Sequence, residues 1–204
     1  MLKIEKRLWD QNYQRVMGLD EVGRGCLSGP VVAAGVIFRE DVNIRGIRDS
    51  KQLSASKRER LAHQIREEAE FWTIRACNPV EIDKMNILHA SIRAMMKCTE
   101  SEGANSDFLL VDGNRFTASL TPFECIVQGD NKSLSIAAAS ILAKVYRDQL
   151  MRGLHHTYPF YGWDTNVGYP TRKHYEGLKK YGYTVHHRKS FKLRTDKAFK
   201  GLDS

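Results

Sequence analysis

Short apolar runs rich in β-branched residues alternate with long amphipathic segments along this chain, and that alternation limits its fold more than any other feature. Apolar residues at every second position predict strands, whereas apolar residues at helical spacing predict helices. The predicted strands cover residues 13–20, 31–38, 71–76, 108–111 and 124–127, and the predicted long helices cover 54–70, 79–100 and 133–151. This mixture predicts a layered α/β domain with some antiparallel hairpin character near its start.

The length of the chain suits one domain, or a core with an appendage, since it has 204 residues. After the helix at 133–151 come a turn-rich segment, 157–170, and two predicted short helices. We therefore expect a core at residues 1–151 and a C-terminal helical extension at 152–204, packed as one compact unit.

The charge balance indicates an anionic partner. The formal net charge is +8 and the isoelectric point is near 9.3, and nucleic acid is the commonest partner of such basic proteins. Residues 170–200 mix lysines and arginines with tyrosines and phenylalanines, a composition that suits phosphate contact together with stacking. A solvated basic tail is the alternative interpretation of this segment.

The cysteines and the apolar runs indicate a reducing compartment inside the cell. The four cysteines are too scattered for a zinc ribbon or a redox pair, so we expect them to be buried as small hydrophobic residues in a reducing compartment. The charged start of the chain has no apolar core of signal-peptide length, and no later stretch approaches the roughly 18 uninterrupted apolar residues of a membrane helix. We expect a soluble cytoplasmic protein that does not enter the membrane, and a monomer, because no heptad seam or swappable arm is present.

Acidic residues lie where the predicted apolar strands stop. Asp20 and Glu21 close the first strand, Asp112 follows the strand at 108–111, and Asp130 follows the strand at 124–127. Strand ends converge on one edge of an α/β sheet, where ligand sites form. Carboxylates gathered there repel one another unless a cation compensates them, and oxygen ligands favour Mg²⁺ or Mn²⁺ over zinc. Two such ions about 4 Å apart can promote phosphodiester hydrolysis.

Each of these acids also has a purely structural interpretation. Asp130 would cap the helix that begins near Ser133, and Asp112 would belong to an Asp-Gly-Asn turn. Asp20 and Glu21 would point to opposite faces of the sheet if their strand continued. Alternatively, the glycines that follow would bend the chain, or the main-chain carbonyl of Glu21 would serve as the ligand.

Gly23, Arg24 and Gly25 form a turn directly after the first acids. Two glycines allow close approach of main-chain N–H groups to a ligand, and Arg24 can meet phosphate. A plain tight turn would explain the glycines equally well. The turn lacks the third glycine of a dinucleotide-binding fingerprint, and the chain contains no phosphate-binding loop of nucleoside triphosphatases.

Several segments together resemble the ribonuclease HII family, and they run in family order from about residue 15 to 192. They are Gly18-Leu-Asp-Glu-Val-Gly-Arg-Gly25, Ser28-Gly-Pro-Val-Val-Ala-Ala34, Asp49-Ser-Lys-Gln-Leu53, Glu81-Ile-Asp-Lys-Met-Asn-Ile87, Val111-Asp-Gly-Asn114, Gly129-Asp-Asn-Lys-Ser133, Ile136-Ala-Ala-Ala-Ser-Ile-Leu-Ala-Lys-Val145 with Arg147-Asp148, Gly168-Tyr-Pro-Thr-Arg-Lys-His174 and His187-Arg-Lys-Ser-Phe191. Several such motifs in one order are far more specific than any single motif.

The resemblance implies a ribonuclease H-like fold, a mixed β-sheet flanked by helices with a C-terminal helical extension. It implies that the acidic metal-binding and catalytic quartet is Asp20, Glu21, Asp112 and Asp130. It further implies that Gly23, Arg24 and Gly25 recognise the ribonucleotide, whose 2′-OH main-chain groups can detect. Tyr169 would pack on the sugar at the RNA–DNA junction, and Lys51 would lie near the scissile phosphate. Lys132, Ser135 and Lys144 would contact the nucleic-acid backbone.

The chain departs from the family pattern at Pro170, where family members usually have a glycine-rich turn after the tyrosine. The related ribonuclease HIII family has an additional N-terminal domain, a lysine in the turn and glutamate as its fourth acid. Arg24, Asp130 and the short segment before the first motif make ribonuclease HII the better match.

The resemblance implies a metal-dependent endonuclease that cuts RNA–DNA hybrids, and duplex DNA holding single ribonucleotides, on the 5′ side of a ribonucleotide. The ends would be 3′-hydroxyl and 5′-phosphate, and the role ribonucleotide removal in replication and repair. We expect His155, His156, His186 and His187 to serve as surface or packing residues. The rival hypotheses are a basic nucleic-acid-binding protein with structural acids, and a relative that cuts branched DNA.

Overall fold

The computed structural model describes residues 1–47, 53–117 and 119–193. Five strands form one sheet in the order β3-β2-β1-β4-β5, with β1 antiparallel to β2, β2 antiparallel to β3, and β1 parallel to β4, as β4 is to β5. The strands are β1 Val16–Val22, β2 Val31–Ile37, β3 Phe71–Cys77, β4 Phe108–Asp112 and β5 Phe123–Ile126. The predicted early hairpin character and the mixed sheet are both confirmed.

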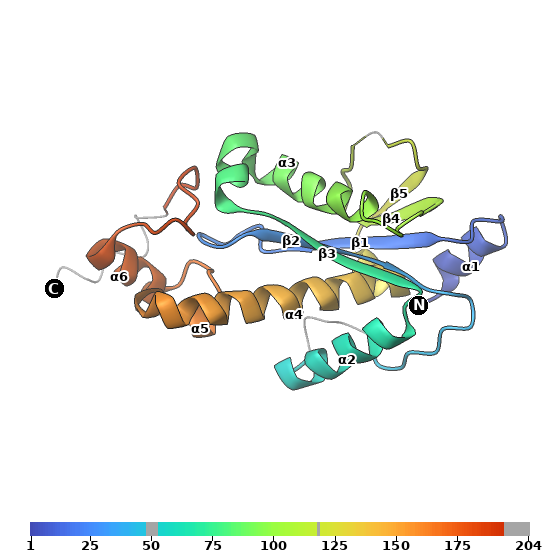
Figure 1. Cartoon of the computed structure of the whole chain (residues 1–204), viewed down its shortest axis with the longest axis horizontal. Helices are drawn as coiled ribbons and strands as arrows, with labels where there is room; N and C mark the ends of the chain where they lie inside the picture. Colours follow the sequence, from blue (N-terminus) through green and yellow to red (C-terminus); the bar gives the residue numbers. More distant parts are fainter. Residues whose placement is uncertain (48–52, 118, 194–204) are drawn as a thin grey trace.

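Helices cover both faces of the sheet (Figure 1). α3 lies on one face, where its buried side chains pack with Met17, Leu19 and Leu109. α4 and α2 lie on the other face, where Val36, Leu61 and Ile141 belong to a single core cluster. The helices are α1 Lys3–Trp9, α2 Ala55–Glu68, α3 Pro79–Thr99, α4 Leu134–Thr157, α5 Trp163–Asn166 and α6 Arg172–Tyr181, with short 3₁₀ turns η1 Gly129–Asn131 and η2 Pro159–Tyr161.

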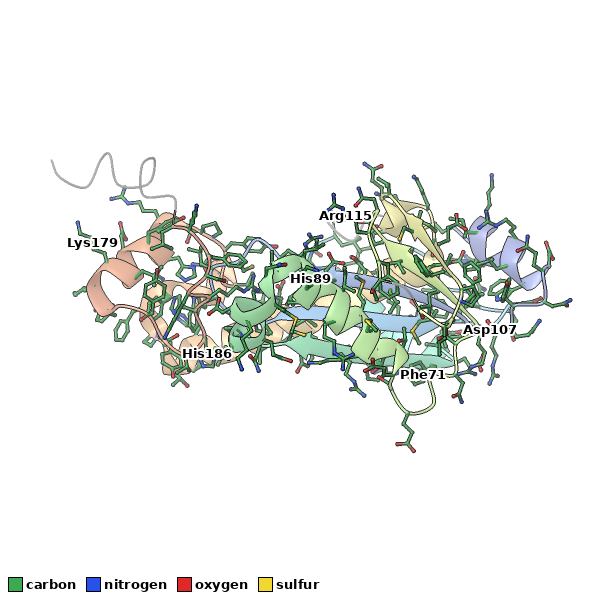
Figure 2. The ribbon with its side chains drawn as sticks, turned by 90° about the horizontal axis from the view of Figure 1, so that it is seen from above. Phe71, His89, Asp107, Arg115, Lys179 and His186 are labelled. Atoms are coloured by element: carbon green, nitrogen blue, oxygen red, sulfur yellow. The ribbon has the colours of Figure 1, made fainter. Side chains whose placement is uncertain are left out.

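The C-terminal segment packs beyond one end of the sheet. Seen from the α3 side in Figure 2, Lys179 and His186 mark this end of the molecule and Asp107 lies towards the opposite end. An aromatic cluster that includes Tyr161, Trp163 and Tyr175 forms the core here, together with Leu27 from the loop after β1. The predicted division at residue 151 falls inside α4, and it stays a prediction.

Two local features differ from the sequence expectations. α1 precedes the first strand, and β1 begins at Val16 instead of residue 13 because the chain still turns at Asn12, whose φ is 67°. β1 also continues to Val22, past both acids. No helix among the described residues is long and apolar enough to cross a membrane.

Candidate active site

The first two acids lie inside β1, so their side chains point to opposite faces of the sheet. Asp20 pairs with Ala34 and Glu21 with Ala33 on the antiparallel neighbour β2. The glycines at 23 and 25 therefore do not bend the strand between the two acids. The sequence left open whether the strand continues or bends at these acids. In the structure, β1 continues through both Asp20 and Glu21.

Asp20 faces α4 and is the more buried of the two acids. The residue is 7% exposed, and its side chain accepts a hydrogen bond from the main-chain N–H of Glu21 at 2.7 Å. Burial raises the pKa of Asp20 well above its usual value, and the nearby charges of Glu21 and Asp112 raise it further, while a hydrogen bond from Ser140 opposes them. A carboxylate destabilised in this way is one that a bound cation would stabilise.

Glu21 forms an ion pair with Arg24, since Nη1 of Arg24 lies 3.0 Å from Oε1 of Glu21. Burial raises the pKa of Glu21 and the charge of Asp112 adds to that shift, but the positive charge of Arg24 lowers it. Arg24 thus offsets part of the repulsion that the carboxylates exert on one another.

Two cavities meet at Glu21, Arg24 and Asp112. The cavity on the α4 side, of about 410 Å³, is also lined by Asp20, Val22, Gly23, Gly25, Arg58, Ser140, Lys144 and Tyr169. The cavity against α3, of about 330 Å³, is also lined by Leu88, Ser91, Ile92, Met95, Gly113, Asn114 and Arg115. The first of these cavities brings three predicted acids, the predicted recognition turn and Tyr169 to one place.

Asp112 ends β4 and is tied to the loop that carries Asp130. Its Oδ1 accepts a hydrogen bond from the N–H of Gly129 at 2.7 Å, so it bonds to that loop and not merely within an Asp-Gly-Asn turn. Asp130 lies in η1 and is 4% exposed. Ser133 is the N-cap of α4, so Asp130 does not cap that helix. Unlike the other three acids, Asp130 lines neither of the two cavities.

The donor set suits a divalent cation such as Mg²⁺ or Mn²⁺, because it consists of carboxylate oxygens with no thiolate or imidazole. The mutual repulsion of Asp20, Glu21 and Asp112 agrees with such an ion. Within residues 1–47, 53–117 and 119–193, however, no three acidic, histidine or cysteine side chains are already arranged to hold a metal. Asp20, Glu21 and Asp112 fit such an ion in chemistry and charge.

Arg188 holds the glycine-arginine-glycine turn from inside the protein. This buried guanidinium donates to the carbonyls of Gly23 at 2.7 Å, Arg24 at 2.9 Å and Gly29 at 3.0 Å. Burial lowers the pKa of Arg188 to about 10, which leaves it charged at neutral pH. The carbonyls that it binds come from two consecutive turns of the chain, so one side chain fixes the orientation of several peptide planes.

Arg147 of α4 supports the same region from the other side. It is fully buried and donates to the carbonyls of Pro30 at 3.0 Å, Ser28 at 3.0 Å and Val167 at 2.8 Å. A Cβ atom on Gly23, whose φ is +94°, would lie 2.2 Å from Nε of Arg147. Arg147 had no role predicted from the sequence, and Arg188 was expected to contact phosphate within the basic segment 170–200, whereas the structure buries it. Both lie in segments that carry the resemblance to ribonuclease HII, which was the available signal, but a buried arginine and an exposed one look alike in sequence.

Tyr169 lies on the wall of the larger of these two cavities, and the residue is 39% exposed. The ammonium of Lys144 lies 6.0 Å from its ring centroid. The turn at Pro170 is closed by a hydrogen bond from the N–H of Thr171 to the carbonyl of Tyr169 at 2.9 Å. Nδ1 of His174 donates to the same carbonyl at 2.9 Å. The main chain at Tyr169 is therefore anchored with proline in the turn.

The remaining predicted contacts have different outcomes. Lys51 lies outside the described residues. Lys144 lines the larger cavity, and Lys132 donates to the carbonyl of Val127 at 2.7 Å. The expectation that Ser135 contacts nucleic acid is wrong for this conformation, because Ser135 is fully buried and bonded to Glu5.

A mixed sheet with acids on its central strands β1 and β4, beside a basic and aromatic C-terminal segment, is the arrangement of a nuclease of the ribonuclease H type. A sequence model of the ribonuclease HII family matches residues 17–194. Ribonuclease HII of Salinibacter ruber is 52% identical over 200 residues, which cover 96% of this chain and 100% of that protein. The chain belongs to the ribonuclease HII family, and it is a type 2 ribonuclease H, a hydrolase that cuts nucleic acid internally.

Solved structures agree with this assignment. Ribonuclease HII from the PCNA complex of Archaeoglobus fulgidus superposes with a TM-score of 0.76 at 26% identity, over 88% of this chain and 96% of that one. Bst-RNase HIII in complex with Mn²⁺ superposes with a TM-score of 0.65 at 19% identity, over 91% of this chain and 69% of that one. The second likeness shows the fold alone, and the family's dependence on divalent metal agrees with the acidic site.

Proposed function

We propose that this protein hydrolyses the phosphodiester on the 5′ side of ribonucleotides, both in RNA–DNA hybrids and at single ribonucleotides embedded in duplex DNA. The products would carry 5′-phosphate and 3′-hydroxyl ends, and the role would be ribonucleotide removal during DNA replication and repair, carried out by a cytoplasmic monomer. The observation that supports this proposal is the single cavity lined by Asp20, Glu21 and Asp112 together with the turn at 23–25 and Tyr169.

The acids Asp20, Glu21, Asp112 and Asp130 would hold two Mg²⁺ or Mn²⁺ ions. When bound, such ions supply activation of a water and stabilisation of the leaving 3′ oxygen, so no side chain need act as the nucleophile. Burial of Asp20 and Asp130 keeps competing water away from the acids. Arg24 sits at the junction of the two cavities, where its charge can also meet a phosphate.

The turn at Gly23, Arg24 and Gly25 would recognise the ribonucleotide through its 2′-OH. A 2′-OH both donates and accepts hydrogen bonds, so fixed main-chain groups can distinguish RNA from DNA. Arg188 accounts for the fixed orientation, because it binds the carbonyls of Gly23 and Arg24. A Cβ at Gly25 would project towards open space, with Tyr169 as its nearest neighbour at 4.0 Å. Substrate, and not the protein's own packing, would therefore occupy that space.

Tyr169 would contact the nucleotide that adjoins the ribonucleotide at the RNA–DNA junction. Its exposed ring can stack on a sugar, and a 2′-hydroxyl would crowd that ring, so the position favours a deoxynucleotide. Lys144 beside the ring would contact the backbone phosphate. Lys51 would lie near the scissile phosphate. This arrangement accounts for cleavage at an RNA–DNA junction.

The decisive experiment is cleavage of an end-labelled DNA duplex that holds one ribonucleotide, with Mg²⁺, Mn²⁺ or EDTA, beside an all-DNA duplex. We expect one metal-dependent cut immediately 5′ of the ribonucleotide and an intact control, and no cut by the Asp20→Asn and Asp112→Asn variants. Cleavage of long hybrids alone would contradict junction sensing by Tyr169. Tight binding without any cut would contradict the nuclease proposal.

A further inference from the structure

Glu5 places a carboxylate in the interior of the protein, on a helix that precedes all four predicted acids in sequence. It lies on α1, is 1% exposed, and has no ion-pair partner among the described residues. Burying a carboxylate without a cation is unfavourable unless hydrogen bonds satisfy it. Oε2 of Glu5 is buried without a hydrogen-bond partner, so the groups that bind Oε1 are the ones that indicate what this residue does.

The partners of Glu5 all belong to the first turn of α4. Oε1 of Glu5 accepts from Oγ of Ser133 at 2.6 Å, from Oγ of Ser135 at 2.9 Å and from the N–H of Ser135 at 3.0 Å. Ser133 also caps the helix, because its Oγ accepts from the N–H of Ile136 at 3.2 Å. A carboxylate at this helix end is favoured by the helix dipole as well.

The same turn carries the loop that holds Asp130. The carbonyl of Gly129 accepts from the N–H groups of Ser133 at 2.8 Å and Lys132 at 2.9 Å, and the N–H of Gly129 donates to Asp112 at 2.7 Å. Asp130 therefore sits in a short bridge with Ser133 at one end and Asp112 at the other. Movement of Ser133 would be transmitted to Asp130 through a few main-chain bonds.

The opposite side of this turn rests on β1. A Cβ atom on Gly18 would lie 2.3 Å from the carbonyl carbon of Ser135, so α4 lies directly on the strand two residues before Asp20. Glu5 and β1 thus hold the start of α4 between them. Without Glu5, the buried hydroxyls and the N–H of Ser135 would lose their shared acceptor.

We propose that Glu5 is a positioning residue for Asp130, which makes α1 part of the catalytic unit. The proposal rests on the proposed function, in which Asp130 holds a metal ion. It also assigns a role to a segment that lies before residues 17–194, the part matched by the family model. The alternative is that α1 serves only to cover part of the hydrophobic core, because Leu8 and Trp9 pack with Val16 and Leu110.

The test compares three variants of the full chain. Glu5→Ala removes the acceptor, Glu5→Gln keeps an oxygen that can accept, and Leu8→Ala weakens the packing of the same helix without touching the serines. Amide hydrogen exchange is measured on the metal-free protein at residues 128–136. We expect exchange roughly 10- to 100-fold faster in Glu5→Ala, and close to wild type in Glu5→Gln and in Leu8→Ala.

Mn²⁺ titration by calorimetry and steady-state cleavage complete the test. Glu5→Ala should bind Mn²⁺ more weakly and lose kcat while KM for the duplex stays within a few fold, and Glu5→Gln should recover both.

Equal effects of Glu5→Ala and Leu8→Ala, or unchanged exchange at 128–136, would overturn the proposal. If Glu5→Ala does not fold, Ser135→Ala removes the hydroxyl bond, one of the three bonds to Glu5, and is measured in the same way. A wild-type protein that cuts nothing would refute the proposed function, while the exchange data would still report on Glu5.

Discussion

The guanidinium of Arg188 binds the main-chain carbonyl of Arg24 at 2.9 Å, so a side chain near the C-terminus fixes the turn proposed to recognise the ribonucleotide. Lysine at position 188 would keep the charge but could not reach three carbonyls at once. We expect Arg188→Lys to lose about 2–3 kcal/mol of unfolding free energy and to cleave single-ribonucleotide duplexes more slowly. Urea denaturation and initial rates measure both effects. The control is Arg93→Lys, since Arg93 pairs with Glu100 on the surface; an equal loss there would contradict a specific role.

Gly23 and Gly25 should respond differently to alanine. Gly23 has φ +94° and a Cβ there would meet Arg147 at 2.2 Å, whereas a Cβ on Gly25 would meet only the Tyr169 ring at 4.0 Å. We expect Gly23→Ala to lose roughly 2–5 kcal/mol of stability. Gly25→Ala should stay within about 0.5 kcal/mol of wild type but lose activity, because its methyl group enters the cavity. Thermal unfolding beside single-ribonucleotide cleavage separates the two, and a fully active Gly25→Ala protein would count against the proposed contact.

The sequence predicted the sheet and its long helices well because apolar periodicity reports which face each segment buries. It missed α1, a short helix whose charged residues at Lys3, Lys6 and Arg7 gave no apolar run to detect. It could not distinguish Arg188, which is buried, from its exposed neighbour Lys189, because both lie in one basic segment. The acids were found because they lie in or just after apolar strands, but the opposite directions of Asp20 and Glu21 depend on where β1 ends, which periodicity does not determine.

We expect Tyr169 to contribute to cleavage through stacking of its aromatic ring and not through its hydroxyl group. Tyr169→Ala should reduce kcat/KM for a single-ribonucleotide duplex by on the order of 10- to 100-fold, which corresponds to the loss of one stacking contact. Tyr169→Phe keeps the ring and should stay within about 3-fold of wild type. Long RNA–DNA hybrids serve as the comparison substrate, since they offer few junctions. The junction role would be excluded if Tyr169→Ala lowered both activities equally.

Neutralising Asp20 should stabilise the metal-free protein while it removes activity. Burial and the charges of Glu21 and Asp112 raise the pKa of Asp20, so its ionised form opposes folding at neutral pH. We expect Asp20→Asn to raise Tm by on the order of 2–4 °C in EDTA, the shift that about 1 kcal/mol produces in a domain of this size. The control is Asp107→Asn, because Asp107 accepts from the N–H groups of Gln14 and Arg15 and its neutralisation should lower Tm. A lower Tm for Asp20→Asn would contradict the repulsion.

Acid should destabilise the protein through a buried pair of histidines behind Tyr169. Nδ1 of His187 accepts from the N–H of Thr184 at 3.0 Å, so Nε2 of His187 carries the proton and donates to Nε2 of His174 at 3.1 Å. Nδ1 of His174 in turn donates to the carbonyl of Tyr169. Both rings are neutral in this network. Burial, together with the repulsion that a protonated His174 or His186 would exert, lowers the pKa of His187 to about 3.

The unfolded chain takes up a proton at His187 near pH 6.5, but the folded chain does so only near pH 3. Between these values the unfolded state binds more protons, so folding stability falls as the pH falls, with a slope that approaches about 1.4 kcal/mol per pH unit for one such histidine. The lowered pKa of His174 acts in the same direction, and the raised pKa of Asp20 acts against it. Urea denaturation in EDTA from pH 7 to pH 4.5 should show this slope in the wild type and a shallower slope in His187→Asn. Equal slopes would show that the acid sensitivity arises elsewhere, and a steeper slope in the variant would contradict neutral burial of His187.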